Sequence, residues 1–126
     1  MSMTSNLEQK VTSAIHAFCE AAIEKSTFAS PAKKDHQLHK IMSTAVNELR
    51  TFGSDGLSAL KDIMQHESPH VRIWAATEML TNGDETAKAV LISLAAEEGL
   101  LGASAKAVLN EHVKGRLRSP FSVSKT

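Results

Sequence analysis

The sequence predicts an all-α fold of about six helices, stacked as antiparallel hairpins into a short α-solenoid. Apolar residues recur at three- and four-residue steps through most of the 126 residues. Aromatic residues make up only 4% and Tyr is absent, a balance that favours helices over sheets. We expect a single domain, 1–126, because this length supports one core but not two ordinary ones, with about 1–5 and 119–126 loosely ordered.

The first half of the chain predicts three helices. One runs from about Leu7 to Ile23, and a second runs from about Ala32 to Thr51. A third starts at Ser54 or Asp55 and continues to the Ser68-Pro69 corner. The apolar positions that we assign to the inner faces of these helices are Leu7, Val11, Ala14, Ile15, Phe18, Ala22, Ile23, Leu38, Ile41, Met42, Ala45, Leu49, Phe52, Leu57, Leu60, Ile63 and Met64.

The corner at Ser68-Pro69 begins a fourth helix, around which the rest of the chain is organised. Pro69 suits the first turn of a helix because it has no amide hydrogen to donate, and Ser68 can cap the free amides there. The residues after the corner that recur at helical spacing, two of them adjacent alanines, are Val71, Ala75, Ala76, Met79 and Leu80. Small residues at this spacing allow a neighbouring helix to approach closely.

The last part of the chain predicts two more helices and a tail. Asn82-Gly83-Asp84 ends the fourth helix and caps a fifth, which runs from about Glu85 to Glu98. Gly99 and Gly102 bracket the next corner, and the sixth helix runs from about Ala103 to Lys114. In the tail, Leu117 and Phe121 are apolar enough to dock on the body of the protein.

Charge and composition predict a cytoplasmic protein that binds neither nucleic acid nor membranes. Lys+Arg and Asp+Glu number 14 each, so no net field attracts a polyanion. The one cysteine, Cys19, cannot form an internal disulfide, which suits a reducing compartment. The longest apolar stretch, Ala89 to Ala96, is too short to span a bilayer, and the N-terminus lacks a signal-peptide pattern.

No group of residues predicts an active site, a metal site or a bound cofactor. His66 and His70 are separated by the corner, and His36 and His39 have too few further ligands nearby for zinc. Cys19 has His16 three residues earlier, but no third orienting group can be named. We therefore expect a protein that is not an enzyme and needs no metal or cofactor.

Trp74 is the candidate for recognition. On a helical wheel it lies opposite the core arc, on the face that carries His70, Thr77 and Glu78. One interpretation is a structural lid over the adjoining helix; the other is an interface anchor, since Trp is enriched at binding hot spots. Arg72 has a similar ambiguity, because it can pair with Glu67 around the corner or contact a partner.

The segment Pro69 to Leu80 resembles a HEAT-like repeat helix, in which a proline corner precedes a Val-Arg pair and a double alanine. More narrowly, the chain resembles a small bacterial family of HEAT-like domains, whose central motif corresponds to His66 to Thr77. The other matching stretches are Gly56 to Leu60, Ala87 to Leu91 and Lys114 to Leu117, and the resemblance covers roughly Leu38 to Arg118. It implies a HEAT- or armadillo-like fold and a similarity to immunity proteins encoded beside polymorphic toxins.

The resemblance implies a protein partner, a cognate toxin domain that is neutralised by occlusion of its active site or substrate path. The expected contact residues are Trp74, His70, Thr77, Glu78, Asp84 and Glu85. The neutral net charge is unlike that expected for an inhibitor of a nuclease toxin, so either local acidic pairs such as Asp84-Glu85 and Glu97-Glu98 serve instead or the toxin is not a nuclease. We expect a monomer or a weak homo-oligomer. The alternative function is a HEAT-like adaptor or scaffold with an endogenous partner, and a hydrolase using Cys19 or a metal ranks below both.

Overall fold

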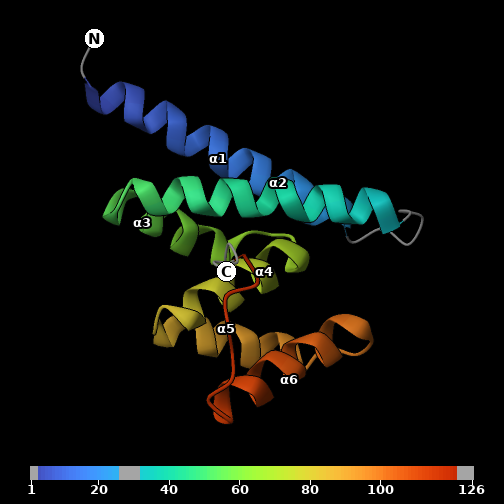
Figure 1. Cartoon of the computed structure of the whole chain (residues 1–126). Coiled ribbons are helices and arrows are strands. Elements are labelled where there is room, and N and C mark those ends of the chain that lie inside the picture. The colour runs from blue at the N-terminus through green and yellow to red at the C-terminus, as the bar shows by residue number, and fades with distance from the viewer. Residues whose placement is uncertain (1–2, 26–31, 122–126) are drawn as a thin grey trace. The chain divides into compact units, whose positions relative to one another are not determined.

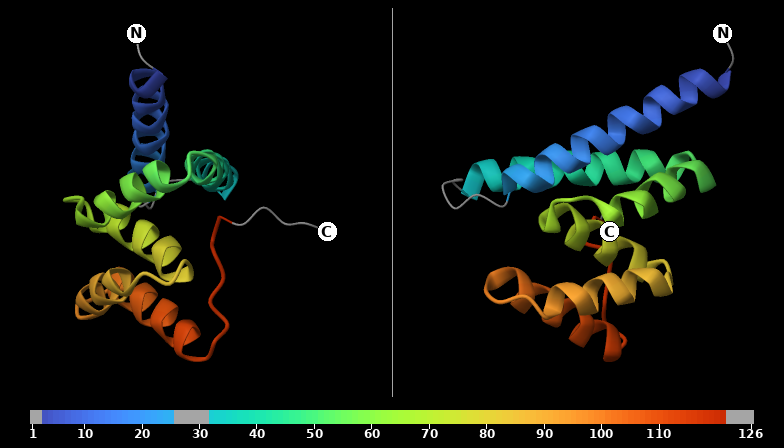
Figure 2. Two further views of the ribbon diagram at one scale, coloured as in Figure 1. Left: turned by 90° about the vertical axis from the view of Figure 1, so that its left-hand side faces the viewer. Right: turned by 180° about the vertical axis from the view of Figure 1, so that it is seen from behind.

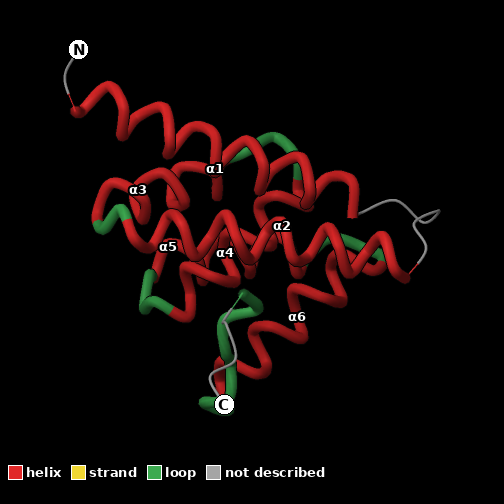
Figure 3. Tube along the Cα trace, turned by 45° about the horizontal axis from the view of Figure 1, so that its top comes forward, coloured by secondary structure: helices red, strands yellow, loops and turns green. Residues whose placement is uncertain are grey.

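A computed structural model of the chain describes residues 3–25 and 32–121, and this part is entirely helical apart from its connections (Figures 1 and 3). The all-α prediction is therefore confirmed. The helices are α1 (Met3–Lys25), α2 (Ala32–Thr51), α3 (Ser54–Asp62), the 3-10 helix η1 (Ile63–Gln65), α4 (Pro69–Thr81), α5 (Glu85–Ala95) and α6 (Leu100–Val113).

The helices divide into two compact units. The first contains the described residues up to Leu60 together with Phe121, and the second contains Lys61–Pro120. The chain therefore leaves the first unit within the last turn of α3 and returns to it at Phe121. Whether the two units act as one domain stays a prediction.

In the first unit, α1 packs against α2 as an antiparallel hairpin. The two helices converge toward residues 25 and 32 (Figures 1 and 2), where the Lys25 ammonium lies 2.9 Å from a carboxylate oxygen of Asp35. The core between them contains the buried residues Ala14, Phe18, Ala22, Leu38, Met42, Val46 and Leu49. Phe121 is fully buried in the same core, with its ring 5.6 Å from that of Phe18 in an edge-to-face arrangement.

In the second unit, α4 packs against η1, α5 and α6, and α5 packs against α6. The end of α4 is a Schellman motif: the Gly83 amide donates to the Leu80 carbonyl at 2.9 Å and the Asp84 amide to the Met79 carbonyl at 3.1 Å. Gly83 fits because its φ of 85° is disfavoured for residues with a Cβ. The Asn82-Gly83-Asp84 stop signal is therefore confirmed as a helix end.

Several predicted element boundaries are wrong. The third helix gives way to η1 after Asp62, and α5 ends at Ala95 rather than near Glu98. α6 begins at Leu100, so Gly102 lies inside a helix instead of at its boundary. Gly102 is buried there, and a Cβ at its position would lie 1.8 Å from the Glu97 carbonyl oxygen. A glycine is needed here because the start of α6 packs closely on the preceding residues, and not because the chain turns at this position.

The predicted loose termini, about 1–5 and 119–126, lie partly outside the described residues, and their looseness stays a prediction. Met3 to Ser5 belong to α1, while residues 1–2 and 122–126 lie outside the described part of the chain. At the other end, Ser119 is hydrogen-bonded to α4 and Phe121 is fully buried. The predicted docking of Phe121 is thus confirmed by its burial. The physical reason is that one aromatic ring buries enough apolar surface to order a short non-helical segment.

Candidate functional site

The corner before α4 is held by a set of local hydrogen bonds over His66 to Arg72. The Ser68 hydroxyl oxygen accepts from the His70 amide at 3.3 Å, and the Ser68 amide donates to Nδ1 of His66 at 2.9 Å. Arg72 donates through Nη1 to the carbonyl oxygens of His66 and Glu67, at 2.8 and 3.1 Å. The predicted cap is confirmed, and Arg72 is used structurally, although with carbonyl groups rather than with the Glu67 carboxylate.

The face of α4 predicted for binding is only partly accessible. His70 and Trp74 are half-buried, but Thr77 is 7% exposed and Glu78 is 1% exposed. The prediction that Thr77 and Glu78 lie on an exposed face is therefore wrong. A helical wheel identifies one buried arc correctly, but it cannot show that other segments pack against the opposite arc as well.

Glu78 is buried because polar groups from the C-terminal tail and from the end of α4 meet its side chain. The Ser119 hydroxyl donates to Oε1 of Glu78. The Asn82 side-chain amide reaches both Oε2 of Glu78, at 3.4 Å, and the Glu78 carbonyl oxygen, at 2.9 Å. Thr77 is satisfied within the helix, since its hydroxyl donates to the Ile73 carbonyl at 2.7 Å. These bonds offset the cost of removing the polar groups from water.

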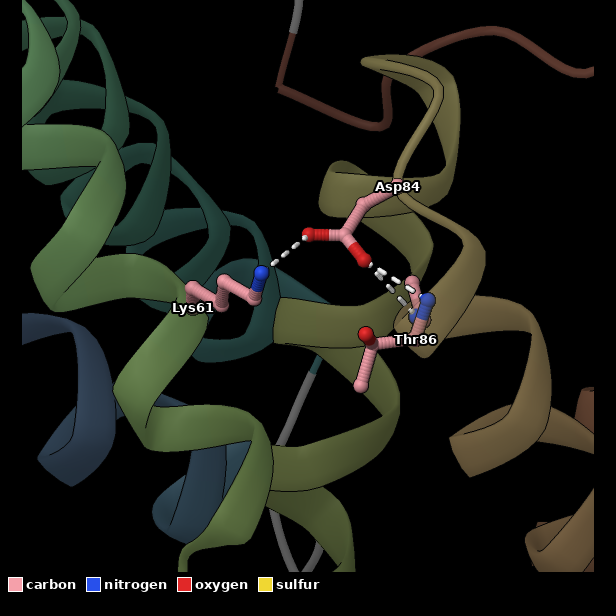
Figure 4. Close-up of polar contacts among 4 residues, drawn as sticks. Lys61, Asp84 and Thr86 are labelled. Carbon is pink, nitrogen blue, oxygen red and sulfur yellow. Dashed lines mark hydrogen bonds and ion pairs between the residues drawn. The ribbon is translucent and has the colours of Figure 1, made fainter.

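Asp84 caps α5 (Figure 4). Its Oδ1 accepts from the amides of Thr86, at 2.7 Å, and Ala87, at 3.3 Å, while Oδ2 lies 3.5 Å from the Lys61 ammonium. Burial alone would raise the pKa of Asp84, but these amides and the Lys61 charge together lower it below its ordinary value. Its neighbour Glu85 is exposed in the first turn of α5. Asp84 thus has a structural role, and Glu85 is the more accessible member of the predicted acidic pair.

A groove between α1 and α2 was missed by the sequence analysis. It has a volume of about 570 Å³ and is lined by Ser13, Ala14, Ala17, Gln37, Lys40, Ile41, Thr44, Ala45 and Glu48. Ile41, which was assigned to the core, is 45% exposed beside it. The sequence carries no signal that could have indicated the groove, because Leu38, Ile41 and Met42 recur at the spacing of one ordinary core-facing stripe.

The cysteine and the histidines considered for catalysis or metal binding lie in surroundings that do not form such a site among the described residues. Cys19 is half-buried, and burial raises the pKa of its thiol above the ordinary value, which disfavours the reactive thiolate. Nε2 of His16 lies 3.1 Å from the Glu20 carboxylate, and the His39 ring stacks on Phe121 at 5.4 Å. Over residues 3–25 and 32–121, no group of three or more His, Cys, Asp or Glu side chains is placed to hold a metal ion.

Comparisons with known proteins assign no family to this chain. No protein-family model, no curated protein and no solved structure matches it. Within the described helices, none is both long enough and apolar enough to cross a membrane.

Proposed function

We propose that this chain is a protein-binding module that neutralises a bacterial toxin domain by covering its active site or substrate path. The observation that supports it best is the partial exposure of Trp74 on α4. Between Val71 and Leu80 only Arg72 and Trp74 retain partial exposure, and Arg72 is engaged at the corner. Trp74 is therefore the large apolar side chain of this helix that a partner can still bury.

The succession of packed helices in the second unit supports a HEAT-like arrangement as part of this proposal. α4, α5 and α6 pack on one another in chain order, as in stacked helical repeats that offer their outer surface to a partner. Ile92, Leu100 and Val113 are large apolar residues exposed on α5 and α6. Each such side chain that a partner buried completely would stabilise the complex by about 1.5–3 kcal/mol.

The revised contact set is smaller than the predicted one. Trp74, His70 and Glu85 retain exposed surface, whereas Thr77, Glu78 and Asp84 are used mainly to fold the second unit. We therefore expect Trp74 to supply apolar contact and Glu85 to supply a carboxylate for a cationic group of the toxin.

Co-expression with a toxin encoded beside this chain tests the proposal. The wild-type chain should restore growth, and Trp74→Ala should weaken binding by about 2 kcal/mol, roughly 30-fold, if Trp74 is a hot spot. Because Trp74 is the only Trp of this chain and Tyr is absent, the emission of this chain reports on this position alone once the emission of the toxin is subtracted. Binding should shift the emission to shorter wavelength and reduce quenching by acrylamide.

Glu78→Ala is the matched control on the same helix. Its side chain is buried, so the substitution should lower the free energy of unfolding and weaken binding only as far as it unfolds the protein. If Trp74→Ala lowers stability as much as it lowers binding, Trp74 is a structural lid. If the wild-type chain does not restore growth but captures an endogenous complex, the adaptor function replaces the immunity function.

A further inference from the structure

The groove between α1 and α2 combines an apolar floor with small residues. It belongs to the first unit, whereas the α4 surface discussed above belongs to the second. Its α1 side is made by Ser13, Ala14 and Ala17, and Ile41 and Thr44 contribute from α2. Small side chains on one helix leave room for large side chains of another helix to enter. Ile41, 45% exposed, is an apolar group of the kind that such a groove accepts.

Two opposite charges of the groove, Lys40 and Glu48, lie on α2 at equal distances from Thr44. Lys40, Thr44 and Glu48 follow one another at four-residue steps and so form one stripe along the helix, with opposite charges about 6 Å on either side of Thr44. Both charged side chains are exposed, and the ion pairs found in the described helices involve neither of them.

We propose that a second copy of this chain docks on this groove, with the two α2 helices antiparallel and a two-fold axis near Thr44. In this arrangement Lys40 of each copy faces Glu48 of the other, because the two residues are equally far from the axis. The stripe is thus complementary to itself, which favours a second copy over an unrelated helix.

The same axis places the exposed Ile41 against the small side of the groove. The Lys25–Asp35 pair fixes the antiparallel register of the hairpin, so Ser13 to Ala17 lie level with about residues 43 to 47 of α2. Ile41 of the second copy, about 4.5 Å from the axis, reaches this level on the first copy. Two short helix faces bury less surface than a standard interface, so the dimer exchanges rapidly and has a Kd in the micromolar range or weaker.

Sedimentation velocity of the full chain over a range of concentrations tests this proposal. The wild-type chain should show a reversible monomer–dimer equilibrium. Lys40→Glu and Glu48→Lys should each raise the Kd by about tenfold or more, because each changes two attractive pairs into two repulsive ones. The double variant should recover the wild-type Kd, and a mixture of the two single variants should form heterodimers, since the pairs are then opposite in charge again.

Lys106→Glu is the matched control, because it makes the same charge change at an exposed position on α6. It should leave the Kd within about twofold of the wild-type value. A wild-type chain that stays monomeric at every concentration overturns the proposal. A dimer whose Kd is insensitive to the charge reversals, or single variants that do not associate when mixed, overturns it as well.

Discussion

At the scale of single residues, Glu78 shows how hydrogen bonds from the protein accompany a buried acidic side chain. Its two oxygens receive the Ser119 hydroxyl and the Asn82 amide, so hydrogen bonds to protein replace hydrogen bonds to water. Since Ser119 lies 41 residues away in the sequence, no local pattern predicts the pair. This contact removes Glu78 from the accessible surface and narrows the candidate site to Trp74 and its exposed neighbours.

Asp84 is the residue for which a pH dependence can be predicted. Asp84→Ala should lower the free energy of unfolding by about 1 kcal/mol at pH 7, because the amides of Thr86 and Ala87 lose their cap. The pKa of Asp84 is lowered in the folded state, so this stabilisation is complete above about pH 4 and is lost as the pH falls through the folded pKa. Urea unfolding at pH 7 and at low pH measures the difference.

Asp62→Ala provides the comparison for Asp84. Asp62 is exposed and makes no side-chain capping bond at the start of η1, so its substitution should change stability by less than about 0.5 kcal/mol. An Asp84→Ala effect that is equally large at pH 7 and at pH 2 would contradict the assigned capping role.

At the scale of helices, Gly56 determines how α3 follows α2. It lies in the first turn of α3, and a Cβ at its position would be 1.9 Å from the Leu49 carbonyl oxygen. The start of α3 therefore rests directly on the backbone of the last turn of α2. The sequence gives this glycine no special position within its helix, because the requirement arises from the neighbouring helix.

Gly56→Ala should lower the free energy of unfolding by about 2 kcal/mol, although Ala is the better helix former by about 1 kcal/mol. The added methyl group forces α3 away from Leu49, and that cost exceeds the gain in helix propensity. Chemical denaturation followed by circular dichroism provides the measurement. Ser58→Ala, at an exposed position of α3, is the control and should be neutral or slightly stabilising; a stabilised Gly56→Ala variant would show that the two helices do not touch here.

At the scale of the whole molecule, the C-terminal tail supplies residues to both units. Ser119 bonds to Glu78 in the second unit, and two residues later Phe121 is fully buried against Phe18 and His39 in the first. The Phe121 carbonyl also accepts from the Asn47 side-chain amide at 3.2 Å. The first unit therefore depends on a residue supplied from the other end of the chain.

Phe121→Ala should lower the free energy of unfolding by about 3–4 kcal/mol, as expected for truncation of a fully buried aromatic side chain. The loss should be greatest in α1 and α2, because Phe121 completes their core. Hydrogen exchange followed by mass spectrometry locates the effect. Leu117→Ala, a half-buried tail position in the second unit, serves as the control; unchanged protection of α1 and α2 in Phe121→Ala would contradict the assignment.

The sequence by itself determined where α2 and α4 begin and end and where α3 and α5 begin, since caps and apolar periodicity act over a few residues. Ser68-Pro69 begins α4, Asn82-Gly83-Asp84 separates α4 from α5, and α2 occupies the predicted range. Only the tertiary structure decided that the second face of α4 is buried, that Ile41 is exposed and that Phe121 packs against Phe18. These depend on which distant segment packs on a face, and a helical period shows that a face is apolar without showing what covers it.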